Sequence, residues 1–297
     1  MQTREKNFSH PEQYLWTDLP DGLQRVAAAP RATPAATLNL FIDQGYAVLP
    51  GGVTDAAVDL FLRDTERLFA DPGSGILVEY WGPQGKRRDI ARAELLNKPE
   101  AKVLDLHSRV PSSQALIFSK PLLGFLRDVF QDEPVAFQSL YFEYGSQQPV
   151  HNDTAFVPVD PSSLMVASWI ALENIVADSG ELFFYTCSQR VCEQVFANGG
   201  KVFDPSDPQA EQYSQTLESI ARRFNLKRVL FRPRKGDALF WAADLFHGGE
   251  KTSSGNTRRS LVTHYCPLRA AVPYARAAGK NPLSVVGGGY ILSDLFP

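Results

Sequence analysis

Residues 136–153 read AFQSLYFEYGSQQPVHND, and the interpretation of the whole chain starts from this stretch. The run Phe137–Tyr144 is rich in aromatic residues, which favour β-strands, and Gly145-Ser146 then signals a turn. The stretch ends with His151 and Asp153. In extended backbone, side chains two residues apart point to the same side, so this imidazole and this carboxylate can approach one ion.

Four further runs downstream have the same strand-like character. They are Leu164–Leu172, Glu181–Tyr185, Asp237–Trp241 and Arg259–Cys266. Turn signals such as Asp178-Ser179-Gly180 and Gly248-Gly249 separate them. Residues 188–226 interrupt the series and predict an insertion of helix, loop and helix. Strands divided by turns indicate an antiparallel β core over residues 136–267.

The sequence upstream of this core has helical periodicity. A helix over residues 38–42 is expected to lead into a short strand at Tyr46–Leu49. A longer helix is predicted to begin at Thr54 or Asp55, either of which can cap it, and to end before Asp71. Two or three more short helices are expected before the core.

Helices followed by antiparallel strands predict a mainly β fold with flanking helices. The expected architecture is a double-stranded β-helix (a jelly-roll, cupin-like core) with an N-terminal helical layer. Prolines and weak periodicity in residues 1–35 suggest an extended lead-in. Residues 36–297 are then expected to form a single domain, with the helical layer at 36–130 and the core at 136–267.

The composition excludes several classes of protein. Hydrophobic residues make up 44% of the 297 and the formal net charge is −3, so the chain can form a sizeable core and lacks the basic excess of a nucleic-acid binder. No apolar run approaches the roughly 18 residues of a membrane helix, and the polar N-terminus does not resemble a signal peptide. We therefore expect a cytoplasmic monomer or small homo-oligomer that acts on a small molecule, without nucleic acid or membrane insertion.

A second histidine completes a possible metal site. His247 stands at the end of the strand-like run that begins at Asp237. Together with His151 and Asp153 it supplies two imidazoles and one carboxylate, the facial triad suited to non-haem Fe(II). Three protein ligands on one face leave positions open for a bidentate 2-oxo acid and for dioxygen. The His-x-Asp pattern alone is weak evidence, because chance produces it often.

The sequence after His247 strengthens this hypothesis. A turn-rich loop leads to Arg258, which an antiparallel hairpin would bring beside the strand that carries His247. A guanidinium can bind the distal carboxylate of 2-oxoglutarate bidentately, and the Ser260 hydroxyl can add a bond. Arg259 is the rival candidate. Strand alternation does not separate the two arginines, because the residues that follow, Leu261 and Val262, are both apolar.

With this set of motifs, the sequence resembles the phytanoyl-CoA hydroxylase family of Fe(II)/2-oxoglutarate oxygenases. The resemblance covers most of residues 38–267. It is carried by Leu38–Gly52, His151–Asp153, Trp169–Leu182, Gly236–Trp241 and the segment from His247 through Ser260.

The resemblance implies a cofactor and a set of site residues. Fe(II) would be held by His151, Asp153 and His247. The co-substrate 2-oxoglutarate would be held by Arg258, with Ser260, Trp169 and, more loosely, Gln138 lining its site. With O2, such an enzyme hydroxylates an unactivated C–H bond of a small molecule and releases succinate and CO2.

Some features depart from the family pattern or leave alternatives open. Residues 186–189 read TCSQ where relatives often have PGSH, and the loop after His247 lacks the usual Pro-Asn. No acyl-CoA activity is therefore inherited from the family name. The carboxylate of Asp153 argues for hydroxylation over halogenation, while desaturation and cyclisation remain open. The alternatives are a metal-dependent cupin-like hydrolase or isomerase, and a non-catalytic binding protein.

The remaining polar residues receive structural interpretations. His264 is expected to be packed or hydrogen-bonded, and Asp244 to have a role in a turn. Lys86-Arg87-Arg88 is either a solvated basic run or an anion clamp. The segments Trp81–Arg92 and Ala197–Gln209 are expected to be loops near the pocket. Three cysteines fit no metal-finger spacing and are expected to be idle thiols: Cys187, Cys192 and Cys266.

Overall fold

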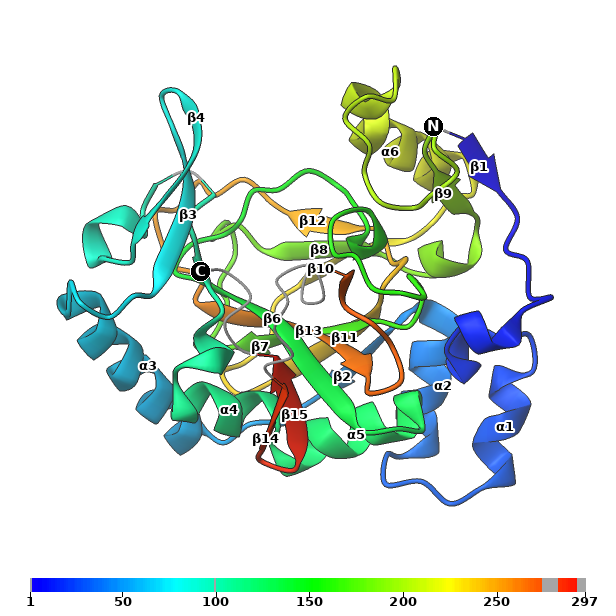
Figure 1. Cartoon of the computed structure of the whole chain (residues 1–297), viewed down its shortest axis with the longest axis horizontal. Coiled ribbons are helices and arrows are strands. Elements are labelled where there is room, and N and C mark those ends of the chain that lie inside the picture. The colour runs from blue at the N-terminus through cyan, green and yellow to red at the C-terminus, as the bar shows by residue number, and fades with distance from the viewer. Residues whose placement is uncertain (1, 99, 274–282, 293–297) are drawn as a thin grey trace.

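The computed structural model describes residues 2–98, 100–273 and 283–292 of the chain. Its largest element is a mostly antiparallel sheet, which we call the major sheet (Figure 1). Its strands lie in the order β2 (Tyr46–Leu49), β11 (Ala238–Ala242), β7 (Val166–Ala171), β13 (Ser260–Pro267), β6 (Pro134–Phe142), β5 (Lys102–Leu104), β3 (Leu77–Gly82) and β4 (Gly85–Ile90). The hairpin of β14 (Leu283–Val286) and β15 (Gly289–Leu292) joins this sheet at β6.

A smaller sheet faces it. This minor sheet has the order β10 (Arg228–Phe231), β8 (Leu182–Tyr185) and β12 (His247–Gly249). A two-stranded ribbon of β1 (Gln2–Arg4) and β9 (Glu193–Val195) lies outside both sheets. In Figure 1 the β3–β4 hairpin and the α6 region stand on the two sides of the minor sheet.

The helices cover the face of the major sheet that points away from the minor sheet. They are α2 (Ala35–Gln44), α3 (Asp55–Ala70), α4 (Pro111–Ile117) and α5 (Lys120–Phe130). Helix α1 (Gly22–Ala28) packs on α2, and α6 (Tyr213–Arg223) lies apart beside β9. Phe240 points to the helices and stacks on Phe125 with ring centroids 4.4 Å apart. The next side chain along β11, Trp241, belongs to the cluster between the sheets. This arrangement confirms the expected jelly roll with a helical layer.

Local signals in the sequence correspond to these elements. Gly45 ends α2 with a positive φ of 82°, a conformation that glycine adopts at no steric cost. Thr54 caps α3 by accepting a hydrogen bond from the Ala57 N–H. The five strand-like runs of the core are β6, β7, β8, β11 and β13, so these predictions are confirmed.

The expectation of an extended lead-in is wrong for residues 2–35. This segment contains β1, α1 and short 3₁₀ turns, and Leu15 and Trp16 are buried. Two of its prolines stand at the start of helical elements, since Pro11 begins a 3₁₀ turn and Pro34 is the N-cap residue of α2. Proline is compatible with a helix start, where the missing N–H has no partner to lose.

Two expectations about loops also need correction. Residues 81–92 are mostly not a loop, since Trp81 pairs with Lys86 across the β3–β4 hairpin. In the 188–226 insertion the first helix is absent, and a 3₁₀ turn at Ser188–Arg190 leads into β9 instead. The second helix is α6, as expected. Strand β9 was missed because only one of its three residues, Val195, is apolar, so the segment shows no strand-like pattern.

Within the described ranges, no helix is long and apolar enough to cross a membrane.

Candidate metal and co-substrate site

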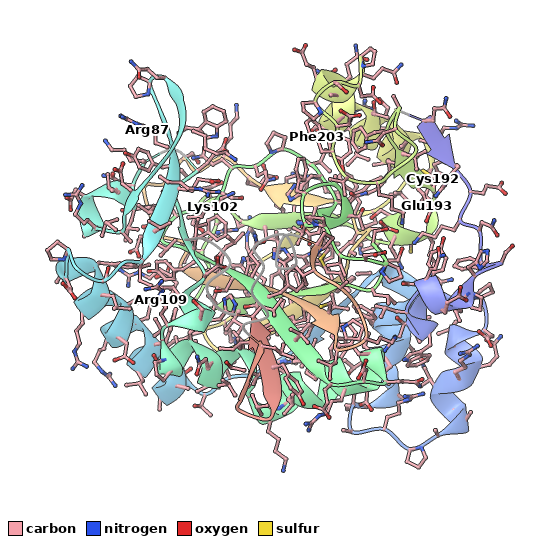
Figure 2. All side chains as sticks on the ribbon, viewed as in Figure 1. Arg87, Lys102, Arg109, Cys192, Glu193 and Phe203 are labelled. Carbon is pink, nitrogen blue, oxygen red and sulfur yellow. The ribbon has the colours of Figure 1, made fainter. Side chains whose placement is uncertain are left out.

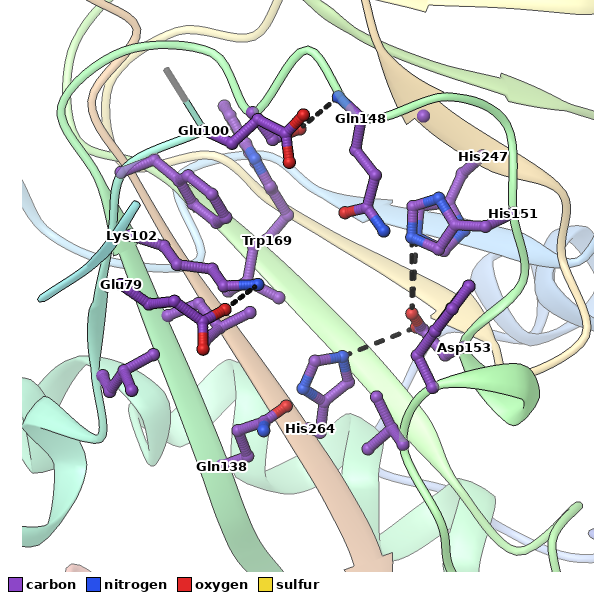
Figure 3. Close-up of a pocket in the computed structure, with 18 of the residues that line it drawn as sticks. Glu79, Glu100, Lys102, Gln138, Gln148, His151, Asp153, Trp169, His247 and His264 are labelled. Carbon is purple, nitrogen blue, oxygen red and sulfur yellow. Dashed lines mark hydrogen bonds and ion pairs between the residues drawn. The ribbon is translucent and has the colours of Figure 1, made fainter. Parts of the chain in front are cut away.

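A cavity of about 380 Å³ lies on the inner side of the major sheet, against the minor sheet. This is the size range of small-molecule sites. The metal-ligand candidates His151, Asp153 and His247 line it, together with Arg258, Trp169 and Gln138 (Figure 3). The structure thus brings most of the residues singled out in the sequence into one cavity.

The backbone places the two histidines side by side. His151 and His247 form an antiparallel bridge, in which each N–H donates to the other's carbonyl oxygen at 2.8 Å. Asn152 is extended, so Asp153 returns to the same side and lies with its Oδ1 3.5 Å from His247 Nε2 and 4.0 Å from His151 Nε2. One ligand atom from each of the three residues falls within 4.8 Å of the others, and all three residues are buried.

The protonation of the imidazoles suits a metal site. His151 Nδ1 lies 2.9 Å from the Pro149 oxygen, and His247 Nδ1 lies 2.9 Å from the Leu245 oxygen. Because a carbonyl only accepts, each Nδ1 carries a hydrogen, and each Nε2 faces Asp153. Burial and the neighbouring His247 lower the pKa of His151 to about 3, so its ring is neutral at pH 7. The donor set therefore fits a divalent ion.

Two residues that the sequence reading did not assign to the site hold Asp153. The Trp241 indole N–H donates to Asp153 Oδ2 at 2.7 Å, and His264 Nε2 lies 3.6 Å from the same oxygen. Burial raises the pKa of Asp153, but the attraction of His247 and His264 outweighs it, so the pKa lies well below the ordinary value. The prediction that His264 is a packed or hydrogen-bonded residue is incomplete, because its ring also lines the cavity. The alternation Ser260, Val262, His264 was the signal available in the sequence.

The structure separates the two arginines. Arg258 is 2% exposed, and its guanidinium lies 5.8 Å and 5.5 Å from the ring centroids of Phe142 and Trp169. Burial lowers its pKa to about 10, so it remains charged at neutral pH. Arg259 points to the other face, where its Nε binds Glu143 Oε1 at 2.7 Å.

Several buried polar atoms around Arg258 lack a hydrogen-bond partner among the described residues: Arg258 Nε, Trp169 Nε1 and Ser260 Oγ. Leaving such a group unpaired costs about 1–3 kcal/mol. Gln138 lines the cavity and is half-buried. A polar, anionic ligand would satisfy these donors, and this is the chemistry of a dicarboxylate such as 2-oxoglutarate.

Asp244 lies outside the cavity lining and has a structural role, as expected. Its carboxylate is 2.8 Å from Lys6 Nζ and 3.1 Å from Lys201 Nζ, and it accepts a bond from Thr154 Oγ1 at 2.9 Å. Lys201 also binds Glu193 of β9 at 2.9 Å. A buried ion cluster thus joins the N-terminal segment and the 197–209 loop to the backbone next to Asp153.

The 197–209 segment is irregular, as expected, but its side chains are anchored. Phe203 stacks on Phe156, which lines the cavity, with ring centroids 5.4 Å apart. Figure 2 shows Phe203 and Glu193 on the side of the molecule that carries α6 and β9. Cys187, Cys192 and Cys266 are free thiols.

A jelly roll with a buried His-Asp-His group supports placing the chain among the 2-oxoglutarate-dependent oxygenases. Residues 41–260 match the model of the phytanoyl-CoA dioxygenase (PhyH) family, and the chain belongs to this family. A curated mouse relative, phytanoyl-CoA dioxygenase domain-containing protein 1, is 24% identical over 170 residues. That match spans 54% of each chain, so the chain covers about half the length of this relative.

Solved structures share the fold. The non-haem α-ketoglutarate-dependent carbocyclase SnoK from nogalamycin biosynthesis has a TM-score of 0.63 at 17% identity, over 90% of this chain and 96% of that one. The epimerase SnoN, in complex with Fe³⁺, α-ketoglutarate and nogalamycin RO, has a TM-score of 0.59 at 18% identity, over 94% and 99%. EctD from S. alaskensis, with 2-oxoglutarate and 5-hydroxyectoine, has a TM-score of 0.58 at 18% identity. The match covers 80% of this chain and 77% of that one.

Proposed function

We propose that the chain is an Fe(II)- and 2-oxoglutarate-dependent dioxygenase that hydroxylates an unactivated C–H bond of a small molecule, releasing succinate and CO2. One observation carries this proposal. The Nε2 atoms of two buried histidines and a buried carboxylate converge in the same cavity as Arg258, a buried arginine whose Nε has no partner among the described residues.

The roles follow from the chemistry of each group. His151, Asp153 and His247 hold the metal, because imidazoles and a carboxylate suit Fe(II). When bound, the iron supplies the activation of O2 that couples decarboxylation of 2-oxoglutarate to oxidation of the C–H bond. Arg258 binds the distal carboxylate of 2-oxoglutarate, with Ser260 and Trp169 as further donors. Gln138 is assigned to the wall of the same site.

The walls of the cavity have a second task. Phe142 and Trp169 flank Arg258 and exclude water from it, which strengthens its attraction for a carboxylate. Trp241 holds the Asp153 carboxylate in one orientation through Oδ2. Halogenating relatives have a small residue at the position of Asp153, which leaves room for a halide. Because a carboxylate stands there in this chain, we assign hydroxylation. The names of SnoK and SnoN describe a carbocyclase and an epimerase, so cyclisation and related outcomes are the alternatives within this chemistry.

The wider assignments complete the proposal. Residues 36–297 form one oxygenase domain against which the N-terminal segment packs. The protein works in the cytoplasm as a monomer or small homo-oligomer on a small-molecule substrate. The SnoN structure contains nogalamycin RO and the EctD structure contains 5-hydroxyectoine, both small molecules.

Reconstitution with Fe(II) tests the function. The protein is loaded without oxygen, and 2-oxoglutarate binding is measured by calorimetry. Air is then admitted, and succinate formation is measured with amino acids, sugars, lipids and polyketides as candidate substrates. We expect tight 2-oxoglutarate binding and O2-dependent succinate. The alternative cupin-like hydrolase or isomerase would turn over without 2-oxoglutarate, and a binding protein would release no succinate. Failure of the iron-loaded protein to bind 2-oxoglutarate would reject the proposal.

A further inference from the structure

The same cavity has a second charged wall, formed by the β3–β4 hairpin and β5. Glu79 on β3 contacts three cations there: Arg88 Nε at 3.0 Å, and the Nζ atoms of Lys86 and Lys102 at 3.2 Å each. We call these four residues the Glu79 cluster. All four line the cavity that contains the His-Asp-His group. In Figure 3 Lys102 and Glu79 lie across the cavity from His151 and His247.

The strand order shows what lies between the two walls. His264, beside Asp153, pairs with Gln138 on β6. Leu104 on β5 pairs with Leu140, two residues along β6. Lys102 then pairs with Glu79 on β3. A ligand seated over Gln138 and Leu140 would therefore touch the His-Asp-His group at one end and the Glu79 cluster at the other.

The Glu79 cluster has more positive than negative charge. These four residues hold three cations for one carboxylate. Two further carboxylates line the cavity and accept other bonds, Glu100 from Trp81 Nε1 and Asp105 from the Ser139 N–H. Glu79 is 5% exposed, and Lys102 is held toward it on a short strand. An ammonium has three N–H donors, so Lys102 can bind Glu79 and a ligand together. Partial burial makes such a contact stronger than one at the open surface.

The basic residues of the β3–β4 hairpin point in two different directions. Lys86 and Arg88 line the cavity, whereas Arg87 between them does not. Successive side chains of a strand point to opposite faces, which explains the division. Figure 2 shows Arg87 near the tip of the hairpin. The basic run therefore contains both cavity residues and a matched outward control.

We propose that the substrate carries an anionic group, a carboxylate or a phosphate, which binds Lys102 and Lys86 while the C–H bond to be oxidised lies near the His-Asp-His group. This inference rests on the proposed function and narrows its substrate class to small anionic molecules. Glu79 serves to align the cations on the cavity wall.

The first test uses inorganic phosphate and acetate as probes. Each is titrated into the protein loaded with Fe(II) and 2-oxoglutarate without oxygen, at constant ionic strength, and binding is measured by calorimetry. The variants are Lys102→Met, Lys86→Gln and the outward control Arg87→Gln. We expect Lys102→Met to weaken binding of at least one probe about tenfold or more, as for the loss of a charge-assisted bond, and Lys86→Gln to weaken it less. Arg87→Gln should match wild type.

The second test compares anionic metabolites with their neutral amides or methyl esters as promoters of succinate release. We expect the anionic members to be the better promoters, and Lys102→Met to remove the difference. Equal probe binding by wild type, Lys102→Met and Arg87→Gln would overturn the inference. Neutral substrates that promote succinate release equally well in wild type and Lys102→Met would also overturn it. If the wild type does not bind 2-oxoglutarate, the failure belongs to the proposed function instead.

Discussion

The Trp241 indole N–H donates to Asp153 Oδ2 at 2.7 Å, and both side chains are buried. The two residues come from different parts of the chain, since Trp241 lies on β11 and Asp153 follows the loop after β6. The bond occupies one carboxylate oxygen and leaves Oδ1 facing His247 Nε2 at 3.5 Å. Trp241 therefore sets the rotation of the carboxylate of a proposed metal ligand.

Replacing Trp241 with Phe should weaken metal binding. The variant keeps the ring but loses a bond to a charged group, worth about 1.5–3 kcal/mol. We expect affinity for Fe(II), or for Co(II) as an air-stable probe, to fall about tenfold or more in calorimetry, with the far-UV circular dichroism unchanged. Trp81→Phe is the control, because Trp81 donates to Glu100 instead. Unchanged affinity in Trp241→Phe would show that Asp153 does not depend on this bond.

The metal ligands give a second prediction. Wild type should bind about one Fe(II) per chain. His151→Ala, Asp153→Ala and His247→Ala should each abolish metal binding and succinate formation, because two remaining ligands do not hold Fe(II). Metal content by atomic absorption and circular dichroism after dialysis check this. His10→Ala, at an exposed histidine, is the control. A His247→Ala protein with full activity would remove His247 from the site.

The two neighbouring arginines should differ strongly. Losing the hydrogen bonds between the Arg258 guanidinium and a carboxylate of 2-oxoglutarate costs a few kcal/mol. This corresponds to a tens- to hundreds-fold loss of affinity. We therefore expect Arg258→Ala to raise the Kd for 2-oxoglutarate by that factor while the metal still binds. Arg259→Ala removes a partly buried pair with Glu143 outside the cavity and should change the Kd little. The opposite ranking, measured by calorimetry on metal-loaded protein, would contradict the assignment.

The buried ion cluster at Asp244 predicts a pH-dependent stability. Burial raises the pKa of Asp244, but ion pairs with Lys201 and Lys6 outweigh it and hold the pKa well below the ordinary value. A depressed folded-state pKa stabilises the fold above the unfolded pKa of about 3.9, and this contribution is lost as the pH falls further. Asp244→Asn should therefore lower the free energy of unfolding by about 3–5 kcal/mol at pH 7, because it removes the ion pair of buried Lys6 and one of the two carboxylates that bind buried Lys201.

The same variant should approach wild type in acid. Below about pH 4 the wild type begins to lose the contribution of Asp244, and the loss grows as the pH falls toward the folded-state pKa, so the difference between the two proteins shrinks. Urea unfolding at pH 7 and pH 3 measures it. Asp21→Asn, which breaks an exposed pair with Arg25, should cost less than about 1 kcal/mol at either pH. A constant difference across this range would mean that Asp244 is not ionised in the folded protein.

The sequence by itself determined the features that depend on neighbouring residues. Gly45 and Thr54 marked the ends of helices because a positive φ and an N-cap bond are local requirements. The core strands were predicted from runs of aromatic and β-branched residues. The spacing of His151 and Asp153 indicated a shared side because extended backbone repeats every two residues. The order of these motifs sufficed to indicate the family.

Only the tertiary structure decided which distant residues meet. Both faces of β13 are buried, so apolar periodicity carried no information on whether Arg258 or Arg259 points inward. The contacts of Asp153 with Trp241 and His264, and of Glu79 with Lys102, depend on which strands are neighbours and in what register. The N-terminal segment looked unstructured because β1 and Lys6 find their partners, β9 and Asp244, only across the folded molecule. Such long-range pairings leave no periodic trace in the sequence, because neither partner constrains the residues next to the other.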